Sequence, residues 1–182
     1  SSVALRRARM AMGKRVQAVC DGDVPRIYRF LEGAEDIIKP NAARITSAAI
    51  AVDCADEGRI GAADEIFAQA KHTANIDHHV TNTMFAQHNA VEAHAAAAAE
   101  VVKKLIEQLD ADFGANIATC LFCGQDGEDE NRATVRRPQA ISPVQRRRPL
   151  PVAETGRSCW GSGQQDASAA QGTMRMLGAA TR

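Results

Sequence analysis

The chain has few aromatic residues, no excess of charge and no long hydrophobic run. One Trp, one Tyr and five Phe among 182 residues leave alanine and the aliphatic side chains to supply most of any core. The 22 basic residues balance the 22 acidic ones, so net charge offers no general attraction to nucleic acid or membranes. No run approaches the roughly 20 apolar residues of a membrane span, and no secretory signal opens the chain. We therefore expect a cytoplasmic protein that does not bind membranes.

The five cysteines do not form a disulfide framework, because their number is odd and their spacing is irregular. Cys20 and Cys54 lie in apolar runs and are interpreted as small buried hydrophobes. Cys120 and Cys123 have the C-x-x-C spacing of some redox and zinc sites, but no second pair accompanies them and a helical pattern runs through both. We interpret them as core thiols in a reducing cytoplasm.

Apolar periodicity predicts alternating helices and strands. Helices are expected over residues 1–12, 59–70, 94–109 and 114–122, and a short helix or turn over residues 26–31. Strands are expected over residues 15–20, 47–52 and a short segment leading into residues 77–79. The small apolar residues 47–52 are typical of a strand buried on both faces. This order predicts an α/β fold, a three-layer domain with a mainly parallel sheet covered by helices.

The composition changes after Gly124. Residues 125–131 are acidic and typical of a turn, and arginine clusters, prolines and small polar residues follow. No apolar period survives for long in this part. We therefore predict a domain over residues 1–124 and a poorly ordered tail over residues 125–182, with the arginine clusters solvated rather than bound to phosphate.

The densest group of ligand-type side chains is Asp77, His78 and His79. They end an apolar segment, where the alternation of an extended strand relaxes into a loop and lets polar heads converge. Burying them without partners is costly, and a divalent metal and a phosphate would supply those partners. Asp53 follows the preceding strand, at the edge where an open α/β sheet usually places its site. The alternative is a turn of polar residues that caps the next element.

Other polar residues have structural interpretations. Asp56 is expected to be a helix N-cap, since a helical pattern begins just after it. We expect His72 and His88 in exposed loops and His94 at the start of a helix.

Three segments together resemble the DHH phosphoesterase superfamily. They are Ala51-Val52-Asp53-Cys54-Ala55-Asp56, the stretch Asn75-Ile76-Asp77-His78-His79-Val80-Thr81-Asn82-Thr83, and Asn89-Ala90-Val91-Glu92. The resemblance is closest to the RecJ-like branch of bifunctional oligoribonucleases and 3′-phosphoadenosine 5′-phosphate phosphatases, and it covers about residues 1–124. The second segment is the specific one, and the first is weaker alone.

The resemblance implies a metal-dependent phosphoesterase with roles for four residues. Asp53 matches the aspartate that bridges two metal ions, usually Mn²⁺, with Mg²⁺ also possible. His78 matches a metal ligand, His79 the histidine that contacts the substrate phosphate, and Asp77 an acidic residue that supports the site. Imidazole with carboxylate is a ligand set that Mn²⁺ accepts. The implied substrates are short oligoribonucleotides or 3′-phosphoadenosine 5′-phosphate.

The sequence also departs from the family pattern. It begins after the position of the family's first, aspartate-rich motif, and residues 125–129 stand where an Asp-Thr-Gly turn is expected. The C-terminal substrate domain is not recognisable. We interpret this as a partial chain with a divergent or out-of-frame C-terminal part, and we expect impaired activity. Two alternatives stay open, a non-catalytic fragment that keeps only the fold, and a pyrophosphate or polyphosphate hydrolase of the same superfamily.

Overall fold

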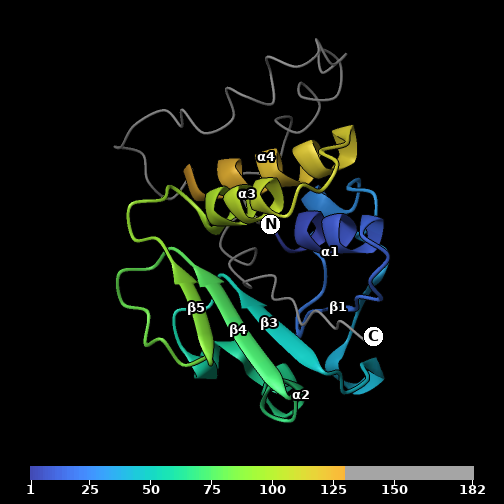
Figure 1. The fold of residues 1–182 in the computed structure, drawn as a ribbon. Coiled ribbons are helices and arrows are strands. Elements are labelled where there is room, and N and C mark those ends of the chain that lie inside the picture. Colours follow the sequence, from blue (N-terminus) through green and yellow to red (C-terminus); the bar gives the residue numbers. More distant parts are fainter. Residues whose placement is uncertain (130–182) are drawn as a thin grey trace.

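Parallel strands covered by helices make up the described part of the chain in the computed structural model, which is residues 1–129, with only the backbone described for residues 126–129. The α-helices are α1 (Ser2–Ala11), α2 (Asp64–Ala68), α3 (Ala98–Gln108) and α4 (Ala115–Asp129), and the 3-10 helices are η1 (Arg26–Tyr28), η2 (Pro40–Ala42) and η3 (Glu57–Ala63). The strands are β1 (Ala18–Val19), β2 (Ile37–Ile38), β3 (Ala48–Val52), β4 (His72–Asp77) and β5 (His88–Val91). Figure 1 shows their arrangement.

All of the strand pairs in the described part are parallel. The larger sheet has the order β3-β4-β5, and β1 pairs with β2 in a separate two-stranded sheet. Val52 pairs with Ile76, so the two strands end side by side. The residues that follow Val52 and Ile76 therefore emerge at the same edge of the sheet.

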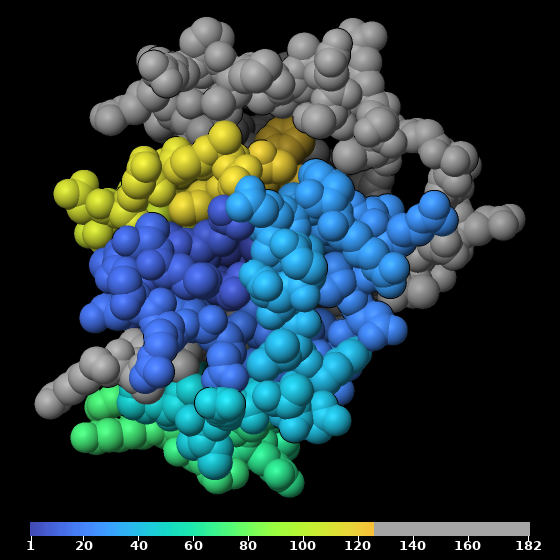
Figure 2. All heavy atoms as spheres, turned by 90° about the vertical axis from the view of Figure 1, so that its right-hand side faces the viewer, coloured from blue at the N-terminus to red at the C-terminus, as the bar shows by residue number. Residues whose placement is uncertain are grey.

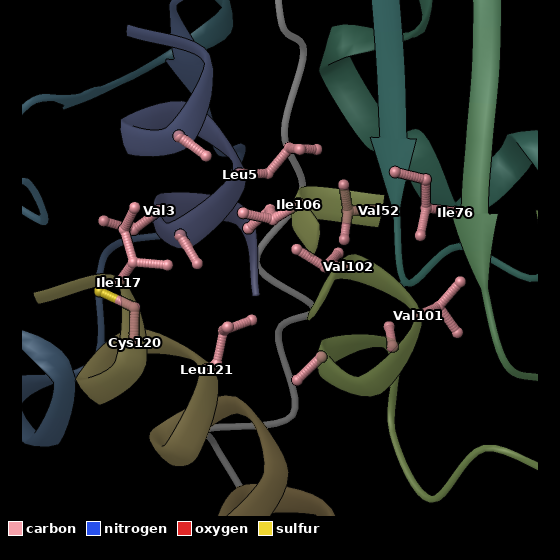
Figure 3. Packing of buried hydrophobic residues seen from close by; sticks show 14 of the residues in the cluster. Val3, Leu5, Val52, Ile76, Val101, Val102, Ile106, Ile117, Cys120 and Leu121 are labelled. Carbon is pink, nitrogen blue, oxygen red and sulfur yellow. The ribbon is translucent and has the colours of Figure 1, made fainter. Parts of the chain in front are cut away.

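Helices cover both faces of the larger sheet (Figure 1). On one face, α1, α3 and α4 pack over Val52 and Ile76, and the close-up in Figure 3 shows Leu5 and Ile106 facing these two side chains. On the other face, η3 and α2 cover the alternate β3 positions, with Phe67 in that second core. This is the three-layer α/β arrangement that the sequence predicts, because β3 is buried on both faces.

The first helix is an internal support rather than a peripheral element. In the space-filling view, the N-terminal residues (blue) fill the space between α3 and α4 (yellow to orange) and the strands (cyan to green) (Figure 2). Leu5 of this helix is fully buried. Gly13 follows with φ +75° and donates its N–H to the carbonyl of Met10, the left-handed glycine turn that commonly ends a helix.

Several element boundaries differ from the sequence prediction. The helix expected from residue 94 begins at Ala98, and the helix expected over 59–70 is broken at Gly61, which has φ +66°. Strands β2 and β5 were not predicted, since β2 has two residues and β5 is a four-residue edge strand that begins with two polar residues.

The acidic segment after Gly124 was predicted to be a turn, and this was wrong for residues 125–129, where α4 continues to Asp129. The rest of the predicted tail, residues 130–182, lies outside the described residues. The boundary proposed at residue 124 stays a prediction. No helix in residues 1–129 combines the length and apolar character of a membrane span.

Candidate metal centre

The four residues singled out in the sequence meet at the carboxyl edge of the larger sheet. Asp53 directly follows β3, Asp77 is the last residue of β4, and His78 and His79 follow it. Each offers one ligand atom, and these atoms all lie within 4.8 Å of one another. The parallel register of β3 and β4 is what brings Asp53, 25 and 26 positions earlier in the chain, to the two histidines.

Asp53 adopts an unusual backbone conformation. Its φ is +64°, in the left-handed region that residues other than glycine rarely occupy. Its N–H donates to the carbonyl of Ile76 at 2.8 Å, so the sheet holds this conformation in place. Backbone strain of this kind is concentrated at functional sites, where the surrounding structure maintains it.

The carboxylate of Asp53 faces both imidazoles. Its Oδ1 lies 3.5 Å from Nε2 of His78 and 3.8 Å from Nδ1 of His79. The same oxygen is buried and accepts no close hydrogen bond from the described residues. Burial raises the pKa of Asp53, but the interaction with His78 and the charges of both imidazoles outweigh it, so the pKa lies below the ordinary value of 3.8. The carboxylate is therefore ionised at neutral pH.

The imidazole of His78 is buried and is held by a backbone carbonyl. Only 3% of the residue is exposed, and its Nδ1 lies 3.3 Å from the carbonyl oxygen of Ala95, in the turn before α3. A carbonyl only accepts, so Nδ1 carries the hydrogen. Nε2 of His78 then faces Oδ1 of Asp53. The close approach of these two atoms is favourable when a proton or a cation lies between them.

Both carboxylate oxygens of Asp77 accept hydrogen bonds from neighbouring side chains. It is fully buried, its Oδ1 accepts a hydrogen bond from Nδ1 of His79 at 2.7 Å, and its Oδ2 accepts one from Nδ2 of Asn82 at 2.6 Å. His79 itself is about one-third exposed in its side chain, at 33%. The arrangement buries the carboxylate and leaves the imidazole accessible.

Two asparagines belong to this site and were not identified from the sequence as functional residues. Asn75 is fully buried in β4, and Asn82 lies in the loop after the histidines. Both donate a side-chain N–H to the carbonyl of Cys54, at 3.1 Å and 3.0 Å. A signal was present, because a buried amide in an apolar strand requires polar partners.

The remaining predicted polar residues lie outside the cluster. Asp56 caps η3 by accepting from the N–H of Arg59 at 3.1 Å, as expected. His72 and His88 are exposed, but each begins a strand rather than lying in a loop. His94 precedes α3 by several residues, so its expected place at the helix start was wrong.

The cysteines of the described part are packed as predicted. Cys20, Cys54 and Cys120 are buried. Cys123 packs partly buried against the same core as Cys120 on α4. Burial raises the pKa of the Cys120 thiol. The C-x-x-C spacing therefore serves helix packing.

Comparison with known proteins gives one curated relative and a solved structure of the same fold, while no family model matches the chain. The relative is the bifunctional oligoribonuclease and PAP phosphatase NrnA of Thermus thermophilus, 37% identical over 126 residues. The aligned part is 68% of this chain and 37% of that protein. The chain thus spans well under half the length of this relative.

The solved structure supports the fold. An exopolyphosphatase-related protein from Bacteroides fragilis superposes with a TM-score of 0.71 at 19% identity, covering 79% of this chain and 46% of that one. Fold, site residues and sequence match define the class: the chain belongs to the DHH phosphoesterase superfamily. Within that superfamily its sequence is similar to NrnA.

Proposed function

We propose that this centre binds divalent cations, with Mn²⁺ preferred and two ions in the complete site, and takes part in the hydrolysis of phosphate esters. The proposed substrates are short oligoribonucleotides or 3′-phosphoadenosine 5′-phosphate. The observation that carries the proposal is the convergence of Asp53, Asp77, His78 and His79 within 4.8 Å, in a chain 37% identical to NrnA over 126 residues.

The donor set fits a divalent cation. Two carboxylates and two imidazoles are ligands that Mn²⁺ accepts, and Mg²⁺ shares the preference for carboxylate oxygen. The buried Oδ1 of Asp53 accepts no close hydrogen bond among the described residues, which leaves it available as a ligand. A bound divalent cation acts as a Lewis acid that activates water and offsets charge on phosphoryl oxygens.

Each residue has a distinct proposed role. Asp53 and His78 would hold the cations, because their facing atoms, 3.5 Å apart, are oriented by the sheet and by Ala95. Asp77 holds His79 through Nδ1 at 2.7 Å. Phosphate oxygens accept hydrogen bonds, so His79 would contact a substrate phosphate through Nε2 when that nitrogen also carries a hydrogen. The exposure of this side chain permits that contact.

A cytoplasmic location is part of the same proposal. The buried cysteines Cys20, Cys54 and Cys120 suit a reducing compartment, where thiols persist without forming disulfides. Short RNA and phosphorylated nucleotides are the partners that this location supplies.

A direct assay tests the proposal. The purified 182-residue chain is supplied with Mn²⁺ and then with 3′-phosphoadenosine 5′-phosphate, a dinucleotide or pyrophosphate, and phosphate or nucleotide release is measured. We expect slow release from one of the first two substrates, in keeping with impaired activity. It should be lost in His78→Ala and retained in His88→Ala, since His88 is an exposed histidine outside the cluster.

The other outcomes separate the alternatives. Release from pyrophosphate alone would indicate the pyrophosphate hydrolase. Silence with all three substrates, together with no heat of Mn²⁺ binding in calorimetry, would indicate a non-catalytic chain that keeps the fold.

A further inference from the structure

Asn82 uses its side-chain amide to join the two sides of the metal centre. Its backbone N–H donates to the carbonyl of His79 at 3.1 Å, and its Oδ1 accepts from the N–H of Met84 at 2.7 Å. Its Nδ2 donates both to Oδ2 of Asp77 at 2.6 Å and to the carbonyl of Cys54 at 3.0 Å. One side chain therefore links the end of β4 to the turn after β3.

These contacts determine how the amide of Asn82 is oriented. An ionised carboxylate and a backbone carbonyl only accept hydrogen bonds, whereas the N–H of Met84 only donates. Turning the amide over would oppose like groups at all three contacts. The orientation is thus dictated by its partners.

The first consequence concerns His79. Asp77 is fully buried and accepts from His79 Nδ1 at 2.7 Å while Asn82 occupies its other oxygen. Because the carboxylate cannot donate, Nδ1 carries the hydrogen. Asn82 occupies the second oxygen of Asp77 and so limits its rotation, and Asp77 in turn keeps the hydrogen of His79 on Nδ1.

The second consequence concerns Asp53. The carbonyl of Cys54, the next residue, accepts from Asn82 and also from the fully buried Asn75. Two amides thereby hold the peptide between Cys54 and Ala55, one residue beyond Asp53, whose φ is +64°. An unfavourable backbone conformation persists only when neighbouring contacts maintain it.

We propose that Asn82 is a positioning residue that orients His79 through Asp77 and Asp53 through Cys54, and so prepares the centre for a cation and a phosphate ester. This inference rests on the proposed function for its purpose. The hydrogen bonds that carry it are made between the protein's own groups.

The test compares Asn82→Ala and the size-matched Asn82→Leu with a control in β5 whose side chain bonds to the same loop. Asn89→Ala is that control, because Asn89 also makes three amide hydrogen bonds, donating to the carbonyls of Met84 and Ala86 and accepting from the N–H of Ala86. It contacts neither Asp77 nor Cys54 in those bonds. Circular dichroism and thermal unfolding establish that each variant is folded.

The first measurement is made without metal. Imidazole ¹⁵N chemical shifts, assigned with His79→Ala, report which ring nitrogen of His79 carries the hydrogen. We expect a single Nδ1–H form in the parent chain and in Asn89→Ala, and a mixture of tautomers in both Asn82 variants. A single Nδ1–H form in the Asn82 variants would overturn the inference.

The second measurement is Mn²⁺ affinity by calorimetry. Loss of partners that orient metal ligands typically weakens binding about 10- to 100-fold, and we expect that range for both Asn82 variants and a change under about twofold for Asn89→Ala. An equal loss in all three variants would indicate general loosening of the loop and would also overturn the inference. If the parent chain binds no Mn²⁺, the proposed function fails, while the tautomer measurement still decides the role of Asn82.

Discussion

At the scale of single residues, Asp53 combines the features that define the site. It stands at a strand end with a left-handed backbone, and its carboxylate lies between two imidazoles. Its pKa lies below the ordinary aspartate value, because the imidazoles outweigh the effect of burial. The same residue is therefore strained, charged and placed to accept a cation.

Replacing Asp53 with Asn tests the role of its charge while keeping its backbone conformation. Asn tolerates the left-handed region, so Asp53→Asn keeps the turn while removing one negative ligand. We expect Mn²⁺ affinity, measured by calorimetry, to fall by a factor of 100 or more, on the order of 3 kcal/mol. Asp56→Asn is the matched control, since Asn also caps helices. Unchanged affinity in Asp53→Asn would exclude the carboxylate as a ligand.

The stability of the metal-free protein should depend on the ionisation of Asp53. A depressed pKa in the folded state means that this carboxylate stabilises the fold above its unfolded pKa of about 3.8. The contribution is lost as the pH falls below that value. Urea unfolding at pH 7 and at pH 3 should therefore show a larger loss for the parent chain than for Asp53→Asn. Equal losses in the two proteins would contradict the depressed pKa.

At the scale of elements, the helices over one face of the sheet pack closely because small residues line their contacts. Gly124 of α4 faces the start of α1 and the side chain of Ala99 in α3. A methyl group built at Gly124 would come within 2.9 Å of the backbone nitrogen of Ser1 and 3.2 Å of the Ala99 Cβ. The same helix carries Cys120 toward the core.

Gly124→Ala should destabilise the protein although alanine favours helices. The close approach to backbone requires α1 or α4 to shift, and overpacking of this kind typically costs about 1–3 kcal/mol. Denaturant unfolding measures the change. Gly114→Ala is the control, because no atom lies within 4 Å of its built Cβ. A Gly124 variant as stable as the parent would show that these helices tolerate separation.

The Cys120 thiol should react slowly in the native protein. Burial raises its pKa, and thiolate rather than thiol is the reactive form. We expect a thiol-directed reagent to label Cys120 at neutral pH only after denaturation, measured by peptide mass spectrometry. The rate at the less buried Cys123 of the same helix gives the comparison. Rapid native labelling of Cys120 would place it outside the core.

At the scale of the whole molecule, the site joins parts of the chain that are distant in sequence. The ends of β3 and β4 supply its ligand-type residues, and the turn before α3 supports His78. The chain spans 37% of NrnA and 46% of the related solved structure. The described domain thus corresponds to one part of those longer proteins.

A cation that joins two strand ends should stabilise the whole domain. A ligand that binds only the folded state at 100 times its dissociation constant adds about 2.7 kcal/mol to the free energy of unfolding. We expect Mn²⁺ to raise the midpoint of thermal unfolding and a chelator to reverse the rise. His78→Ala should show no rise. A rise of equal size in that variant would place the cation elsewhere.

The sequence alone was sufficient to predict the α/β class and the four ligand-type residues. The class follows from the order of apolar periods, and Asp77, His78 and His79 are contiguous, so their convergence needs only a strand that ends there. It missed β5, because half of its four residues are exposed and no apolar run marks it. The turn expected after Gly124 was also wrong, since the helix continues through polar residues.

The contacts that hold the site residues in place could be seen only in the folded structure. The register of β3 against β4 brings Asp53 to the histidines, and register depends on pairing between segments that are separate in the sequence. The left-handed turn at Asp53 and the amide contacts of Asn75 and Asn82 with Cys54 arise only once those strand ends are adjacent. Ligand chemistry is a property of residue types, whereas ligand geometry requires the folded sheet.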